Sequence, residues 1–206
     1  MTQITSGIRG VLSNPTVYNF LQSLLGAGRA RKCLIRDHIR LKSGDHLLDI
    51  GCGTGELLHY LPTDVHYTGF DLSPDYIRAA RKLYGNRGRF ECSDVADFEP
   101  ADLVGVDLVL AIGVLHHLDD NQALRLFQTA WNKLRPGGRF ISLDGALVNG
   151  QSRIARALIL RDRGQNIRSP EGYRALAASR FPSITCTVRH DLLYVPYTHC
   201  ILECTR

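Results

Sequence analysis

The most constraining feature of this chain is an apolar segment that breaks into alternating glycines. The segment 46–50 is typical of a buried strand, and it is followed at once by Gly51, Gly53 and Gly55. Glycines at the end of a buried strand leave the main chain bare, so a ligand can lie directly against it. Asp71 ends the next apolar run, about 20 residues further on, where a carboxylate suits the two hydroxyls of a ribose. The pattern predicts a nucleoside site at the edge of a parallel sheet.

The spacing of the glycines distinguishes two kinds of nucleotide-binding loop. The dinucleotide pattern G-x-G-x-x-G/A needs a small third residue, because the following helix packs closely on the strand there. Counted from Gly51, that position holds Glu56, which is long and charged. Asp49, two residues before the first glycine, would repel a pyrophosphate. It suits an ammonium group or the loop itself. Both residues therefore disfavour a nicotinamide-dependent oxidoreductase.

The string D-x-G-x-G-x-G at 49–55 resembles the first motif of the class I S-adenosylmethionine (SAM) dependent methyltransferases, and the resemblance extends over roughly residues 43 to 145. It implies SAM as cofactor and S-adenosylhomocysteine as product. It also implies an α/β fold, a Rossmann-like doubly wound sheet of seven strands, mostly parallel, with one antiparallel strand near the C-terminus. We expect one domain over 1–206, with a helical cap (1–42), a SAM-binding core (43–145) and substrate-side helices with closing strands (146–206).

The order of strand and helix signals supports this topology, because alternating strands and helices predict a parallel sheet covered on both faces. Further strands are expected at 65–70, 89–92, 106–112 and 139–143, with a closing pair at 184–190 and 199–204. Helices are expected over most of 14–42, interrupted at 26–28, and at 54–61, 75–84, 119–134, 151–160 and 170–179.

The resemblance implies cofactor-binding residues at the carboxyl ends of the first four strands. Asp71 is expected to hold both ribose hydroxyls, with Leu72 against the adenine. Asp94 is expected to accept a hydrogen bond from the adenine amino group, and Val95 to pack on the ring. The methionine portion is expected to contact the glycine loop and the next strand end, at Asp49, Gly51, Cys52, Gly53, Gly55 and Ala111. The acidic residues Asp97 and Glu99 are alternatives to Asp94.

Two histidines follow the fourth strand, where a methyl acceptor must approach. Neutral imidazole is a suitable base near pH 7, and His116 is the first candidate for that role, before His117. Each histidine can instead cap the next helix or contact the cofactor. Asp144 ends the fifth strand and can orient His116, take the acceptor proton or fix its own loop. Tyr18 either closes over the cofactor or packs in the core.

Charge is distributed unevenly along the chain, whose formal net charge is +5. Residues 43–145 carry 9 basic and 15 acidic side chains, against 7 and 1 in residues 1–42 and 9 and 4 in residues 146–206. The basic flanks either form a solvated surface or make a substrate mouth that favours an anionic acceptor. In the second case, forked guanidinium groups between the fifth strand and the closing pair would hold the anion; these are Arg153, Arg156, Arg161, Arg163 and Arg168.

Several other functions are disfavoured by what the sequence contains. No run of about 18 apolar residues predicts a membrane span, and the first residues do not resemble a secretory signal. Six cysteines without a C-x-x-C pair predict no metal and reduced thiols, as in the cytoplasm. The pI near 9.0 allows an RNA methyltransferase, but the amine-methylating motif N/D-P-P-Y is absent from the sequence. A SAM-binding regulatory protein without catalysis is a third hypothesis. The leading prediction is methyl transfer to an oxygen of a small molecule, such as a natural-product, sugar or cell-envelope precursor.

Overall fold

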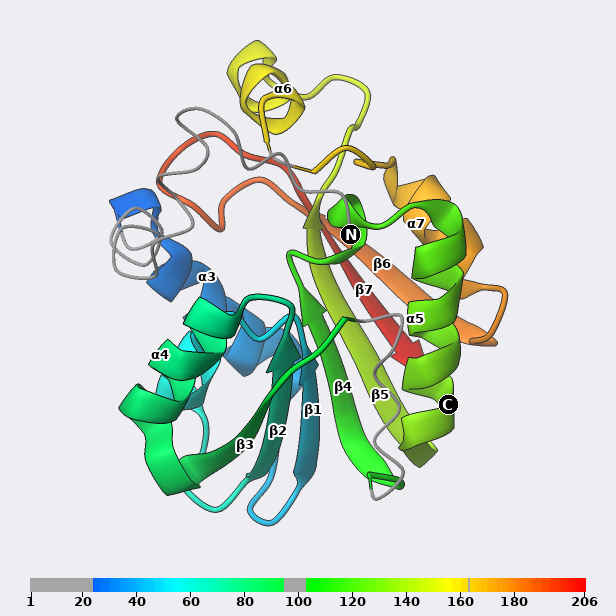
Figure 1. Cartoon of the computed structure of the whole chain (residues 1–206). Coiled ribbons are helices and arrows are strands. Elements are labelled where there is room, and N and C mark those ends of the chain that lie inside the picture. The colour runs from blue at the N-terminus through cyan, green and yellow to red at the C-terminus, as the bar shows by residue number, and fades with distance from the viewer. Residues whose placement is uncertain (1–23, 95–102, 163) are drawn as a thin grey trace.

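The computed structural model describes residues 24–94, 103–162 and 164–206. Its centre is a seven-stranded sheet in the order β3-β2-β1-β4-β5-β7-β6 (Figure 1). The strands are β1 (His46–Ile50), β2 (His66–Asp71), β3 (Gly88–Cys92), β4 (Val106–Ile112), β5 (Leu134–Gly145), β6 (Ser183–Arg189) and β7 (His199–Thr205). Strands β1 to β5 pair in parallel, whereas β7 runs antiparallel to both β5 and β6. The predicted fold class, with one reversed strand near the C-terminus, is confirmed.

Helices cover both faces of the sheet, so successive residues of a central strand face different cores. On β4, Leu108 and Leu110 pack with α3 (Ala27–Leu34) and α4 (Pro74–Tyr84). Val109 and Ala111 pack on the opposite face with α5 (Asp120–Lys133) and α7 (Pro170–Ala177). All four side chains are fully buried. The uninterrupted apolar run of this strand is therefore typical of a sheet without a solvent face.

Local capping signals account for where two of the helices begin. The Ser73 hydroxyl accepts a hydrogen bond from the Tyr76 N–H, and Pro74 occupies the first turn of α4. Asp119 and Gln122 form a reciprocal capping box at the start of α5. Both helices begin within one residue of the predicted positions. The short helix α6 (Arg153–Leu160) and α7 also lie where the sequence pattern predicted helices.

The helix predicted at 54–61 was wrong, because this stretch forms only a five-residue 3-10 helix, Glu56–Tyr60. Gly55 has a φ of 74°, a left-handed conformation that delays the helix start. Leu61 is extended, as a residue before proline prefers. The two constraints leave too few residues for an α-helix. The helical segment expected after the interruption near residue 26 is present, because α3 continues without a break into a π-helical turn, Ile35–Ile39.

Strand β5 differs from its predicted bounds. Strand β5 is longer than the predicted 139–143, because Leu134 already pairs with Val106 before a register shift. Five residues with a role predicted from the sequence lie outside the described residues: Tyr18, Val95, Asp97, Glu99 and Arg163. Within the described parts of the chain, none of the helices has the length and apolar character needed to cross a bilayer.

Candidate functional site

The candidate site lies where the strand order reverses, between β1 and β4. Strand β1 pairs with β2 on one side and with β4 on the other. The connections that leave β1 and β4 therefore depart to opposite sides and leave a crevice outside the carboxyl ends of the strands. The glycine loop follows β1, and the segment that contains His116 follows β4. The topology thus brings both predicted groups to one edge of the sheet.

The glycine loop is fixed to the end of β2 by backbone hydrogen bonds and by one carboxylate. The N–H groups of Gly51 and Cys52 both donate to the Phe70 carbonyl, at 2.8 and 3.0 Å. One Asp71 oxygen accepts the Gly53 N–H at 3.0 Å, and the other accepts the Ser73 N–H at 2.8 Å. Each carboxylate oxygen can accept a further hydrogen bond. Asp71 therefore organises the loop and retains acceptor capacity toward the crevice.

The three glycines of the loop are required for different reasons, although all have positive φ values of 56–74°. A Cβ on Gly51 would lie 2.5 Å from Val114 Cγ2, and one on Gly55 would lie 3.0 Å from Phe90 Cε1. A Cβ on Gly53 would meet no atom of the described residues within 4 Å. Gly51 and Gly55 therefore allow close packing, whereas Gly53 presents bare main chain to open space.

Asp49 lies beneath this loop and is almost completely buried. The Tyr67 hydroxyl donates a hydrogen bond to Asp49 Oδ2 at 2.6 Å. Burial raises the pKa of Asp49 to about 7, against the lowering effect of the Tyr67 hydrogen bond, and the charge of Asp71 raises it further. Cys52 packs inward, because a Cβ on Gly69 would lie 2.9 Å from the Cys52 sulfur. The Cys52 backbone holds the loop together, because its N–H donates to the Phe70 carbonyl and its own carbonyl accepts the Gly55 N–H at 3.0 Å.

His116 and Asp144 form a buried pair at the end of β4 and β5. Asp144 Oδ1 lies 2.8 Å from His116 Nδ1 and also accepts the His116 backbone N–H at 3.2 Å. Burial disfavours the charged imidazole, but the hydrogen bond and charge of Asp144, with the charge of Asp162, outweigh it. The pKa of His116 is therefore raised above its usual 6.5. Within the described parts of the chain, a Cβ on Gly113 would have only His116 Cε1 within 4 Å, at 3.9 Å. The imidazole edge thus lies beside a bare glycine.

A distant segment covers the other edge of His116. A Cβ on Gly164 would lie 2.1 Å from His116 Cδ2, and the Asn166 N–H donates to the His116 carbonyl at 2.9 Å. The Tyr197 hydroxyl, from the loop between β6 and β7, donates to Asp162 Oδ2 at 2.6 Å. Sequence reasoning missed Asp162, Gly164 and Tyr197 as members of this cluster. No local motif marks them, and they meet only because the segment after α6 and the loop between β6 and β7 come together beside the end of β4.

The other predicted residues lie where their strands place them. Leu72 is 43% exposed beside Asp71. Asp94 follows β3 and is partly exposed, and Ala111 is fully buried in β4. The His117 ring packs on the His116 ring, with 4.1 Å between the centroids. His117 therefore contacts the ring that Asp144 orients.

Among the described residues, the arginines considered for an anion site lie in different surroundings. Arg168 donates to the carbonyls of Leu115 and Leu118, at 3.0 and 2.8 Å, and pairs with Asp120 at 2.6 Å. Its guanidinium therefore fixes the turn after β4, which contains His116. Arg153 and Arg156 are exposed on α6.

Comparison with known proteins identifies the kind of domain to which this site belongs. Residues 48–140 match the family described as "Methyltransferase domain". The 27-O-demethylrifamycin SV methyltransferase of Amycolatopsis mediterranei is 36% identical over 115 residues, which are 52% of this chain and 41% of that protein. Phosphoethanolamine N-methyltransferase 1 of Triticum aestivum is 28% identical over 161 residues, 75% of this chain and 32% of that protein. The chain thus spans less than half the length of these curated relatives.

A solved structure shows the same fold. Phosphoethanolamine N-methyltransferase 2 of Haemonchus contortus, in complex with phosphomonomethylethanolamine and S-adenosylhomocysteine, superposes with a TM-score of 0.73. The alignment has 16% identity and covers 93% of this chain and 56% of that chain. The family match at residues 48–140 and the shared fold support a methyltransferase domain of the class I, SAM-dependent type.

The family's cofactor is SAM, and the residues present in the crevice fit it. Gly53 offers unobstructed main chain, Asp71 has acceptor capacity for a diol, and Leu72 offers an exposed apolar side chain beside it. Asp49, with a carboxyl whose pKa is raised to about 7, suits a positively charged neighbour.

Proposed function

We propose that this protein transfers the methyl group of SAM to a hydroxyl of a small-molecule acceptor, with His116 as general base and Asp144 as the residue that positions it. When bound, SAM supplies an activated methyl group on a positively charged sulfur. The protein's own residues then have three tasks, which are binding the cofactor, aligning the acceptor and removing its proton.

Cofactor binding is assigned to the residues of the first three strand ends and of β4. Asp71 takes the ribose hydroxyls and Leu72 contacts the adenine, with Asp94 and Val95 completing the adenine site. The methionine portion lies along the loop at Asp49, Gly51, Cys52, Gly53 and Gly55 and at the backbone of Ala111. What supports this assignment is the fixed loop geometry and the open space above Gly53.

Proton removal is assigned to His116 because of its contacts. Asp144 accepts from Nδ1–H and so leaves Nε2 as the basic nitrogen; the Nε2 atom lies between Cε1, which faces Gly113, and Cδ2, which faces Gly164. A neutral hydroxyl is a weak nucleophile until its proton is removed, whereas a neutral amine is nucleophilic while it still carries its protons. A preorganised base thus favours an oxygen acceptor, and this pair is the single observation that carries the proposal. General-base catalysis of this kind is worth roughly 10²–10⁴-fold in rate.

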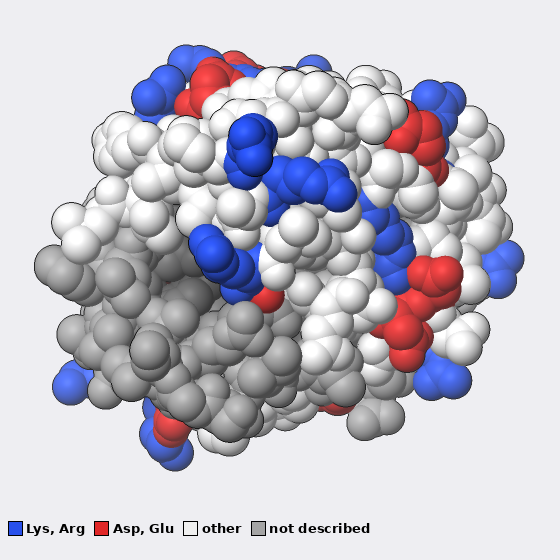
Figure 2. Space-filling view, turned by 90° about the horizontal axis from the view of Figure 1, so that it is seen from above, with Lys and Arg blue, Asp and Glu red and all other residues white. Residues whose placement is uncertain are grey.

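The proposal also includes the charge of the acceptor, which we expect to be anionic. Figure 2 views the molecule from above, the end from which α6 projects, and basic side chains gather across the middle of that face. Such a surface raises the local concentration of anions. The wheat and Haemonchus relatives are named for phosphoethanolamine, a phosphate ester, so phosphorylated compounds belong in the acceptor screen beside polyhydroxylated natural products.

The test combines an acceptor screen with isotope-labelled SAM and the variant His116→Ala. Turnover of the accepted compound should fall by roughly 10²–10⁴-fold, while the Kd for SAM, measured by titration calorimetry, stays within about twofold. His117→Ala is the matched control and should retain most of the turnover. Unchanged turnover in His116→Ala would remove the base assignment. SAM binding without transfer to any acceptor would favour a non-catalytic role, and a steep salt dependence of RNA binding would favour an RNA substrate.

A further inference from the structure

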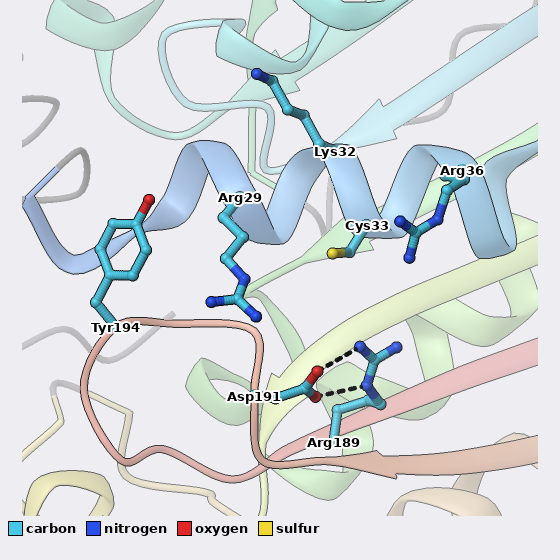
Figure 3. A pocket seen from close by; sticks show the side chains of 7 residues that line it. All are labelled: Arg29, Lys32, Cys33, Arg36, Arg189, Asp191 and Tyr194. Atoms are coloured by element: carbon cyan, nitrogen blue, oxygen red, sulfur yellow. Dashed lines mark hydrogen bonds and ion pairs between the residues drawn. The ribbon is translucent and has the colours of Figure 1, made fainter.

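A second cavity, of about 520 Å³, lies between α3 and the segment that links β6 to β7 (Figure 3). None of the residues assigned to cofactor binding or proton transfer lines it. Its lining comes from two parts of the chain more than 150 residues apart and consists of Arg29, Lys32, Cys33, Arg36, Arg189, Asp191 and Tyr194. We call it the α3 cavity. The Tyr194 N–H donates to the Leu25 carbonyl at 3.0 Å, which holds its two walls together.

The α3 cavity concentrates positive charge from both basic flanks of the sequence. Four of the seven lining residues are Lys or Arg, and one is acidic. The Arg189 side chain is more enclosed than that of Arg36, since the first is 23% exposed and the second is 70% exposed. Cations brought together from two separate elements repel one another more than cations spread along a solvated helix face. The arrangement therefore favours a bound counter-charge.

Two carboxylates hold two of these guanidinium groups in place. Arg189 donates to both oxygens of Asp191, at 2.8 and 2.9 Å. Arg36 donates to both oxygens of Asp37, at 2.6 and 2.8 Å, and that carboxylate also lies 3.8 Å from Arg189. Four cations against these two carboxylates leave an excess of two positive charges.

The excess resides on α3. Among the residues that the structure describes, neither Arg29 nor Lys32 has an acidic partner within 4 Å. In Figure 3 the Arg29 guanidinium points from α3 toward Asp191 across the cavity, whereas the Lys32 side chain leaves the helix on the opposite side, with its Nζ 6.0 Å from the centre of the Tyr60 ring. The pKa of Asp191 is lowered to about 2, first by the hydrogen bonds from Arg189 and, to a smaller extent, by the charge of Arg29. The Arg29 charge therefore faces the cavity, whereas Lys32 contributes its charge from the other side of α3.

From this geometry we propose that the α3 cavity binds a phosphate ester or diphosphate. A phosphate monoester carries a charge of about −1.5 to −2 near pH 7, which matches the excess of two. Arg36 and Arg189 each donate through Nε and Nη2 to a carboxylate, which fixes the guanidinium plane and leaves Nη1 as a donor for a phosphate oxygen. The site does not depend on methyl transfer, because it shares no residue with the catalytic pair.

The experiment titrates inorganic pyrophosphate into the full-length protein and follows the heat of binding. A single saturable site is expected, with an affinity that falls as NaCl is raised from about 50 to about 500 mM, where exposed charges are screened. The double variant Arg29→Ala/Lys32→Ala should weaken the Kd about 10-fold or more, as expected for lost charge-assisted hydrogen bonds. The matched control, Arg153→Ala/Arg156→Ala, removes two exposed arginines from α6 and should leave the Kd within about twofold.

Cys33 gives an independent readout of the location, because it lines the cavity. Pyrophosphate should slow alkylation of Cys33 by iodoacetamide about fivefold or more at saturation, as read by peptide mass spectrometry, provided the site is there. Cys92 is exposed at the end of β3 and should react at an unchanged rate. Malonate, a dicarboxylate at the same concentration, should protect Cys33 less.

Absence of saturable binding, or an equal loss in both double variants, would overturn the proposal. Protection of Cys92 to the same degree as Cys33 would do so as well. The phosphate group can belong to the methyl acceptor or to a separate ligand. In the first case pyrophosphate inhibits turnover in competition with the acceptor identified by the screen, and in the second case added acceptor does not relieve its effect. Failure of SAM binding or turnover would leave the pyrophosphate result unaffected, so the two proposals fail separately.

Discussion

The two walls of the crevice are built in different ways. The cofactor wall, from Asp49 to Ser73, comes from two neighbouring strands and one loop, and its hydrogen bonds join residues of consecutive elements. The acceptor wall joins His116 to Asp144, and it brings in Asp162 and Tyr197 from segments that follow later. The first wall is a local motif, whereas the second exists only in the folded chain. Substitutions should therefore act on the two walls through different physical terms.

The largest effect should come from Gly51→Val in the cofactor wall. The new side chain would overlap Val114, which lies 2.5 Å from the Cβ position, and β-branched residues avoid the positive φ of 72°. We expect a loss of about 3 kcal/mol or more in the free energy of unfolding, measured by urea denaturation, together with loss of SAM binding.

Gly53→Ala is the matched control for this effect. Its Cβ meets no described atom within 4 Å, so only the backbone strain of about 1 kcal/mol should appear in stability. SAM affinity should still fall, because the methyl group would stand in the open space above the loop. Equal destabilisation by the two variants would contradict the distinction between packing and binding glycines.

The next prediction concerns Asp71, whose carboxylate holds the glycine loop and is proposed to bind the ribose. Asp71→Asn keeps one acceptor oxygen, so the N–H of Gly53 or of Ser73 loses its partner. A lost hydrogen bond to a charged group corresponds to about 1.5–3 kcal/mol, and the Kd for SAM should rise about 10- to 100-fold by calorimetry. Asp75→Asn, on the exposed start of α4, should leave the Kd unchanged.

The next prediction concerns the buried carboxyl of Asp49 and its effect on the free energy of unfolding. Burial raises its pKa to about 7, so between about pH 4 and pH 7 the folded state holds a proton that the unfolded state releases. This contribution to stability is fully present below about pH 4 and is lost as pH rises through about 7. The amide introduced by Asp49→Asn does not titrate, so the variant should be more stable than the wild type above pH 7, by a few kcal/mol at most. Parallel pH–stability curves for the two proteins would show that Asp49 does not titrate there.

The smallest expected effect concerns the pH dependence of kcat, through His116 and Asp144 in the acceptor wall. Burial lowers the pKa of His116, but Asp144 outweighs burial and the pKa is raised above 6.5. A base acts when neutral, so kcat should fall as pH drops below this raised value. In Asp144→Asn, burial still lowers the pKa of His116, but the carboxylate that raised it is gone. The acid limb of the pH profile of kcat should therefore move to lower pH, and the maximal kcat should decrease. An acid limb at the same pH in both proteins would assign that ionisation to another group.

Much of the cofactor wall could be predicted because its contacts are short in sequence. Three glycines, Asp49 and Asp71 lie on a strand–loop–strand unit whose geometry follows from positive φ values and parallel pairing. What the sequence did not reveal was that two of these glycines serve packing against Val114 and Phe90, because those neighbours depend on how the elements dock. The α-helix predicted at 54–61 failed for a local reason, because Gly55 and the proline at 62 restrict the segment to a 3-10 turn.

By itself, the sequence determined the order of strands and helices, the class of fold and the nucleoside-binding loop, since these depend on local periodicity, capping and backbone freedom. The tertiary structure alone decided that Asp144 pairs with the His116 ring, that Arg168 fixes a turn, and that basic residues from both flanks meet at the α3 cavity. Contacts between segments far apart in the chain depend on the sheet that brings them together, and no spacing along the chain encodes them.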